Sequence, residues 1–123
     1  MEGDTVPADS ATLRDNGVVY LPRGITEREK LDAAIAEIEP MLGADVVRLK
    51  HTIEENWSGR PSIYFRVLLT DRASKPPRLY KVTSRIENII EEHVDPRNLW
   101  DLIPYYRFRS QSEQKMLKEP AWA

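Results

Sequence analysis

The chain has 123 residues, 41% hydrophobic and 31% charged, which favours a single soluble domain and argues against wholesale disorder. Its 18 basic and 20 acidic residues give a net charge of −2, so the molecule as a whole has no field that attracts nucleic acid or acidic membranes. Cysteine is absent, which excludes disulfides, thiolate catalysis and thiolate metal sites and fits a cytoplasmic location.

The first 24 residues are expected to form a flexible tail followed by an extended arm. Residues 1–10 show no periodicity and lack the features of a secretory signal. No apolar run reaches the roughly 20 residues that span a bilayer, so we expect no membrane association. The apolar run at residues 18–21 follows Asn16-Gly17 and precedes Pro22. It fits an edge strand after a tight turn and, equally, an arm lying on the core or on a neighbouring subunit.

Residues 25–118 are predicted to form one domain, which begins with a helix. Thr26 and Glu29 have the spacing of a capping box. Five apolar residues then recur at helical spacing: Leu31, Ala34, Ile35, Ile38 and Leu42. Gly43 is expected to stop this helix. Pro40 should kink it or end it earlier, because a proline inside a helix loses a hydrogen bond and clashes with the preceding turn.

Two strands are predicted next, because the apolar period changes to two after Asp45. In the first strand, one face is expected to carry Val47, Leu49, His51 and Ile53. In the second, one face is expected to carry Ile63, Phe65, Val67 and Leu69. The polar residues 54–61 between these strands indicate a long hairpin loop, so antiparallel pairing is the simplest topology.

A second helix is expected from Arg78 to Val94, after a polar connector with two prolines. Residues 105–109 then form a third strand, which should bury Tyr106 and Phe108. A second capping-box pattern at Ser110-Gln111-Ser112-Glu113 opens a short helical segment, and residues 119–123 are predicted to be a tail. The order helix, strand, strand, helix, strand predicts an α+β fold. Its sheet would be small and mainly antiparallel, with three to four strands and two helices packed on one face.

Catalytic, cofactor and metal sites are not expected, because the reactive residues are few. His51 falls on the apolar face of a strand, where a solitary histidine is most often a hydrogen-bonded core residue. His93 stands beside Glu91, Glu92 and Asp95, but a helix spreads consecutive residues around its circumference. We interpret His93 as a favourable charge at a helix C-terminus. A hydrolase built around either histidine is the weakest of three functional hypotheses.

Nucleic-acid binding is the second hypothesis, because basic residues cluster between positions 72 and 85 around Tyr80. The candidate contacts are Arg78, Lys81 and Arg85 of the second helix and Arg107 and Arg109 of the third strand. The competing interpretation is that these side chains solvate the helix and shield apolar neighbours with their stems. The isoelectric point of 5.7 favours that alternative over a dedicated nucleic-acid binder.

Protein binding is the leading hypothesis, because aromatic side chains occur where exposure is expected. Trp57 lies in the polar hairpin loop, and either projects as an anchor or folds back over the sheet. Trp122 is expected to dock on a partner or on a second copy of the chain. Tyr105, on the outer face of the third strand, is the third candidate partner contact, whereas Trp100 is predicted to pack in the core or at the sheet edge.

The whole pattern resembles two known groups. The element order is similar to that of the half-ferredoxin and type II KH-like folds, although the Gly-x-x-Gly clamp of KH domains is absent. The run from Ile103 to Glu113, with the hairpin from Gly59 to Phe65, resembles a class of small uncharacterised bacterial proteins. In that class a strand with a Pro-Tyr/Val-x-Arg-Phe core ends in a Ser/Thr-x-x-Glu turn. The resemblance covers about residues 31–117.

Members of that class occur beside a HEPN-like helical protein, so the resemblance implies an antitoxin-like or accessory role and such a partner. It transfers no catalytic residues onto this chain. The leading hypothesis is therefore a non-catalytic protein-interaction module, the neutralising or accessory member of a bacterial two-protein system. Pairing of an unpartnered sheet edge with a second copy would make it a homodimer.

Overall fold

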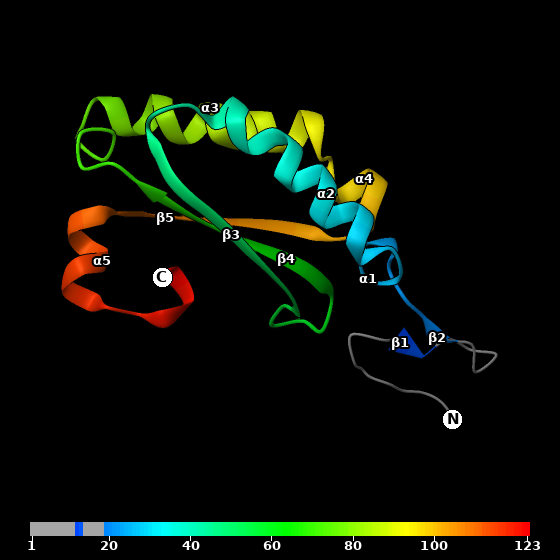
Figure 1. Ribbon diagram of the computed structural model, residues 1–123. Helices are drawn as coiled ribbons and strands as arrows, with labels where there is room; N and C mark the ends of the chain where they lie inside the picture. Colours follow the sequence, from blue (N-terminus) through cyan, green and yellow to red (C-terminus); the bar gives the residue numbers. More distant parts are fainter. Residues whose placement is uncertain (1–11, 14–18) are drawn as a thin grey trace.

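Three strands form the main sheet, in the order β3-β4-β5 (Figure 1). The computed structural model describes residues 12–13 and 19–123, in which β3 spans Val46–Glu55, β4 spans Pro61–Leu69 and β5 spans Ile103–Ser110. The β3–β4 hairpin is antiparallel, as predicted, while β5 runs parallel to β4. The parallel pairing follows from the crossover through α3, which returns the chain to the end of the sheet where β4 begins. The α+β fold class is confirmed.

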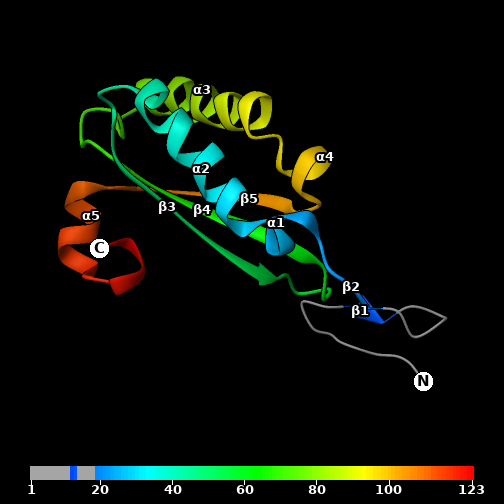
Figure 2. The ribbon, with the colours of Figure 1, turned by 45° about the vertical axis from the view of Figure 1, so that its right-hand side comes forward.

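Two helices, α2 (Arg28–Ile38) and α3 (Arg78–His93), lie over the same face of this sheet in both ribbon views (Figures 1 and 2). Their apolar stripes meet the inward residues of β4, and Ile63, Phe65, Val67 and Leu69 are completely buried there, as predicted. The shorter helices are α1 (Arg23–Thr26), η1 (Glu39–Leu42), α4 (Pro96–Trp100), α5 (Gln111–Leu117) and η2 (Pro120–Trp122). No helix in the described residues has the length and apolar character to cross a membrane.

The first predicted helix begins later than its capping-box pattern indicated. Thr26 belongs to the short helix α1, and its hydroxyl donates to the Arg23 carbonyl oxygen instead of capping α2. The residue before α2 is Glu27, whose side chain makes no cap hydrogen bond. The capping-box prediction at Thr26 was therefore wrong, because the preceding turn is already helical. The expected early end at Pro40 is confirmed, since α2 stops at Ile38 and continues as the 3₁₀ turn η1 up to Gly43.

A bulge at the start of β3 changes which residues face the core. The pairing register with β4 shifts between Val46 and Arg48, and Val47 is 40% exposed instead of facing inward as predicted. An extra residue in one strand turns its neighbours relative to the simple alternation. Leu49 is buried again, and the pairing register with β4 is unbroken from there to the hairpin loop.

The segment before α1 does not join the main sheet. β2 (Val19–Tyr20) pairs antiparallel with β1 (Thr12–Leu13) in a separate two-stranded ribbon, so residues 19–20 are extended but do not form the edge strand of the main sheet that was one of the two alternatives. The predicted turn at Asn16-Gly17 lies outside the described residues. The folded unit begins before residue 25, because Gly24 is already buried. Leu102 packs so closely against it that a β-carbon at position 24 would lie 2.4 Å from Leu102 Cδ1.

Candidate interaction surface

The hairpin loop between β3 and β4 presents Trp57 to solvent with 93% of its surface exposed. Asn56 organises this loop, since its side-chain oxygen accepts hydrogen bonds from the Ser58 and Arg60 amides at 2.9 and 3.0 Å. The Asn56 side-chain amide donates to the Tyr105 hydroxyl at 3.1 Å, which ties the loop to β5. The loop is therefore held by hydrogen bonds while its indole projects, which settles the open alternative in favour of an exposed Trp57.

The face of the sheet turned away from α2 and α3 carries polar and aromatic side chains, and we call it the open face. Tyr64 of β4 and Tyr105 of β5 lie opposite each other there, with ring centroids 5.0 Å apart and planes at 13°. Thr52 of β3 completes this row across the sheet. The tyrosine pair is a stacked aromatic unit beside the Trp57 loop.

The next row of the open face consists of three cations in register: Lys50 of β3, Arg66 of β4 and Arg107 of β5. Like charges directly opposite in a sheet are destabilising. Arg66 donates to the Thr52 hydroxyl at 3.2 Å, and Lys50 donates to the Ala123 carbonyl oxygen at 2.6 Å. The described strand positions of this row hold no carboxylate, and Lys50 is the member of the row that meets an oxygen of the C-terminal residue.

The C-terminal segment closes one end of the open face, and α5 and the C-terminus lie on this side of the sheet in both views (Figures 1 and 2). Trp122 is only 6% exposed, the Arg109 guanidinium lies 4.4 Å from its ring centroid, and Arg48 donates to its carbonyl oxygen at 3.1 Å. Arg109 also pairs with Glu119 at 2.7 Å. The prediction that Trp122 docks on a partner or on a second copy was therefore wrong, because this indole is buried against Arg109 and Arg48 of the chain's own sheet.

The five residues predicted to contact nucleic acid do not form one surface. Arg78 and Arg85 pair with Asp45 at 2.9 and 3.4 Å, on the helix side of the sheet. Lys81 is exposed on the same helix, whereas Arg107 and Arg109 lie on the open face, with the sheet between the two sets. Arg78 and Arg85 instead fix the corner between α2 and β3, and Arg85 also donates to the Leu42 carbonyl oxygen at 2.9 Å.

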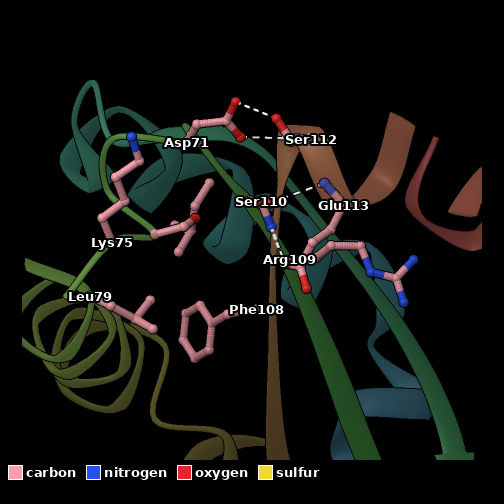
Figure 3. Close-up of a pocket in the computed structure, with 10 residues that line it drawn as sticks. Asp71, Lys75, Leu79, Phe108, Arg109, Ser110, Ser112 and Glu113 are labelled. Atoms are coloured by element: carbon pink, nitrogen blue, oxygen red, sulfur yellow. Dashed lines mark hydrogen bonds between the residues drawn. The ribbon is translucent and has the colours of Figure 1, made fainter. Parts of the chain in front are cut away.

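A pocket of about 550 Å³ lies at the end of β5, between the connector after β4 and the start of α5 (Figure 3). Asp71 projects toward Ser112, whose hydroxyl and backbone amide both donate to its carboxylate, and these hydrogen bonds hold the pKa of Asp71 below its usual value. Ser110 caps α5 by accepting from the Glu113 amide at 3.1 Å, which confirms this capping box. The hydroxyls of Ser110 and Ser112 thus both make hydrogen bonds within the fold, and neither histidine of the chain lines the pocket.

The two histidines lie far from this pocket. His51 is half-buried, 6.3 Å from the Phe65 ring, and its Nε2 is 2.9 Å from the Asp32 carboxylate. Burial raises the pKa of Asp32, but hydrogen bonds from His51 and Arg28 outweigh it and bring that pKa below its usual value. His93 is exposed in the last turn of α3, as predicted. Within the described residues, no group of histidine and carboxylate side chains is arranged to hold a metal ion.

A half-buried tyrosine, Tyr106 of β5, lies on the helix side of the sheet. Tyr106 donates its hydroxyl proton to Glu91 of α3, and its pKa lies well above the usual value because of burial and this hydrogen bond. Burial, with the nearby Glu91 charge, likewise raises the pKa of Glu87. The Tyr106–Glu91 hydrogen bond links β5 to α3.

Sequence reasoning missed the contributions of Lys50, Tyr64 and Arg66 to the open face. The alternation did place Tyr64 and Arg66 opposite the buried residues of the second strand. What it lacked was the register of β4 with β5, which brings Tyr64 to Tyr105 and Arg66 to Arg107. No protein-family model, curated protein or solved structure matches this chain.

Proposed function

We propose that this protein is a non-catalytic protein-interaction module that binds its partner through Trp57 and the hairpin loop around it. The observation that supports this is an indole 93% exposed on a loop held by Asn56. Tryptophan is enriched among residues that dominate interface energetics, because its large apolar surface is buried on binding. A loop already held by hydrogen bonds loses less conformational entropy when it binds.

The partner class follows from the resemblance of the strand from Ile103 and the Ser110 turn to small bacterial proteins. On that basis the chain is the neutralising or accessory member of a two-protein system, with a HEPN-like helical protein as its partner. Tyr105 contributes by holding the Trp57 loop through Asn56. A homodimer through a sheet edge belongs to the same proposal, since among the described strands β3 and β5 each pair on one side only. Sedimentation at twice the monomer mass supports it, and a monomer at all concentrations contradicts it.

Photo-crosslinking from the loop tests the binding role directly. A benzoylphenylalanine in place of Trp57 is expected to form an adduct with one protein in the native host, identified by mass spectrometry. The control is the same substitution at Tyr80, which is 79% exposed on α3. Adducts from position 57 alone support the proposal. The absence of an adduct, or the same adduct from both positions, contradicts it.

A further inference from the structure

Basic side chains gather on the open face of the sheet. At the positions of the three strands that face away from α2 and α3, the register places five cations: Arg48, Lys50, Arg66, Arg107 and Arg109. Glu54 is the one carboxylate among the strand positions of that face. On the other side of the sheet the charges nearly balance, since α2 carries three carboxylates and two cations and α3 carries three of each. The net charge of −2 therefore conceals a cationic surface.

We propose that the open face binds single-stranded nucleic acid, at the rows Lys50–Arg66–Arg107 and Thr52–Tyr64–Tyr105. This site goes beyond the protein-binding role of Trp57. The cationic row would contact consecutive phosphates, since its residues belong to adjacent strands about 4.8 Å apart. A phosphate would relieve the repulsion between Arg66 and Arg107, the two aligned cations that the C-terminal segment does not contact, whereas Lys50 already meets an oxygen of Ala123.

The row Thr52–Tyr64–Tyr105 adds aromatic rings on which bases can stack. Tyr64 and Tyr105 already stack on each other, and Tyr105 belongs to an edge strand, so a base can extend the stack outward from the sheet. Unpaired bases stack on sheet aromatics in other single-strand binders, whereas a duplex hides its base faces. Two rows across three strands accommodate about two or three nucleotides.

The rest of the open face limits the length of this site. Arg109 and Arg48 are engaged with Trp122, and Lys50 at the edge of the cationic row donates to Ala123 of the C-terminal segment. Arg107 is exposed and, among the described residues, makes no ion pair, so it is the cation most available to a phosphate. A ligand would therefore cross the sheet between the Trp122 end and the hairpin loop.

Fluorescence anisotropy with 5′-fluorescein-labelled twelve-nucleotide oligouridine and oligothymidine tests the site. With about three phosphates neutralised, the slope of log K against log salt is expected to be about −2, so affinity should fall about fifteenfold between 50 and 200 mM salt. Arg107→Glu is expected to weaken binding more than tenfold. Lys81→Glu, the same charge change on the helix side, should leave it within twofold.

Tyr105→Leu is expected to weaken binding about tenfold with little change in the salt slope, because stacking is not ionic. Arg107→Gln repeats the test without reversing charge, and the thermal midpoint verifies that each variant folds. The proposal is overturned by no binding at 50 mM salt or by equal losses in Arg107→Glu and Lys81→Glu. It is also overturned if a polyglutamate peptide binds as tightly as the oligonucleotides and Tyr105→Leu is silent, which would identify an acidic protein segment instead. Neither result affects the Trp57 crosslink, so the two proposals fail separately.

Discussion

The three tryptophans show how neighbouring groups decide exposure. Trp100 is buried and donates its ring N–H to the Val94 carbonyl oxygen at 2.9 Å, with the Arg23 guanidinium over its ring. Trp122 is buried against Arg109 on the open face. Trp57, by contrast, extends from a turn whose hydrogen bonds are satisfied within the loop. Two of the three indoles therefore stabilise the fold, and one remains available for binding.

Truncation of the two tryptophans outside the main core should change the free energy of unfolding by very different amounts. Trp122→Ala is expected to lower the free energy of unfolding by about 3 kcal/mol, because it removes a buried indole and leaves a cavity. Trp57→Ala should change it by less than about 0.5 kcal/mol, since the side chain is exposed. Urea denaturation of both variants measures the difference. Equal stabilities would show that the C-terminal segment does not pack on the sheet.

Glu27 gives a specific dependence of stability on pH. Hydrogen bonds from Arg23 and Lys30, 2.6 and 2.9 Å away, lower the pKa of Glu27 from 4.5 to about 2. A carboxylate whose pKa is lower in the folded state stabilises the fold above its unfolded pKa, and this contribution disappears as the pH falls toward 2. The stability advantage of the wild type over Glu27→Gln should therefore shrink between about pH 5 and about pH 2.5.

The control for this pH series is Glu29→Gln, which changes an exposed carboxylate in the first turn of α2, two residues after Glu27. Its stability difference from the wild type should vary less over the same range, because among the described residues Glu29 makes no ion pair. A stability difference between the wild type and Glu27→Gln that stays constant with pH would show that the Arg23 and Lys30 contacts do not favour the charged form of Glu27.

At the scale of elements, local sequence patterns predicted secondary structure correctly where no long-range contact overrode them. The alternation from Leu49 onward and the capping box at Ser110 both appear as predicted. The similar pattern at Thr26 failed because residues 23–26 form a helix of their own, which depends on packing of Gly24 against Leu102 from the far end of the chain. Such long-range contacts leave no local signal in the sequence.

The two capping patterns provide a matched test at this scale. Ser110→Ala is expected to cost about 1 kcal/mol, because it leaves the Glu113 amide without its cap. Thr26→Ala should cost clearly less, since its hydroxyl only donates to a carbonyl in its own turn. Thermal unfolding of both variants compares them. A larger loss for Thr26→Ala would contradict the assigned start of α2.

At the scale of the whole molecule, the fold class could be predicted from the sequence, but which basic residues share one face of the sheet could not. Side-chain periodicity identified both main helices and all three strands of the main sheet. The parallel placement of β5 decides that Arg66 and Arg107 meet, and that Arg78 and Arg107 lie on opposite sides. Pairing between distant segments depends on the packing of α3 over the sheet, so the basic helix and the basic strand looked like one site in the sequence.

The central claim is tested most directly by measuring the affinity of the purified Trp57→Ala variant for the purified partner that crosslinking identifies. An exposed anchor that becomes buried on binding contributes about 2 kcal/mol or more, so the dissociation constant should rise about thirtyfold while the thermal midpoint stays unchanged. A dissociation constant equal to that of the wild type would contradict the assignment of the hairpin loop as the binding surface.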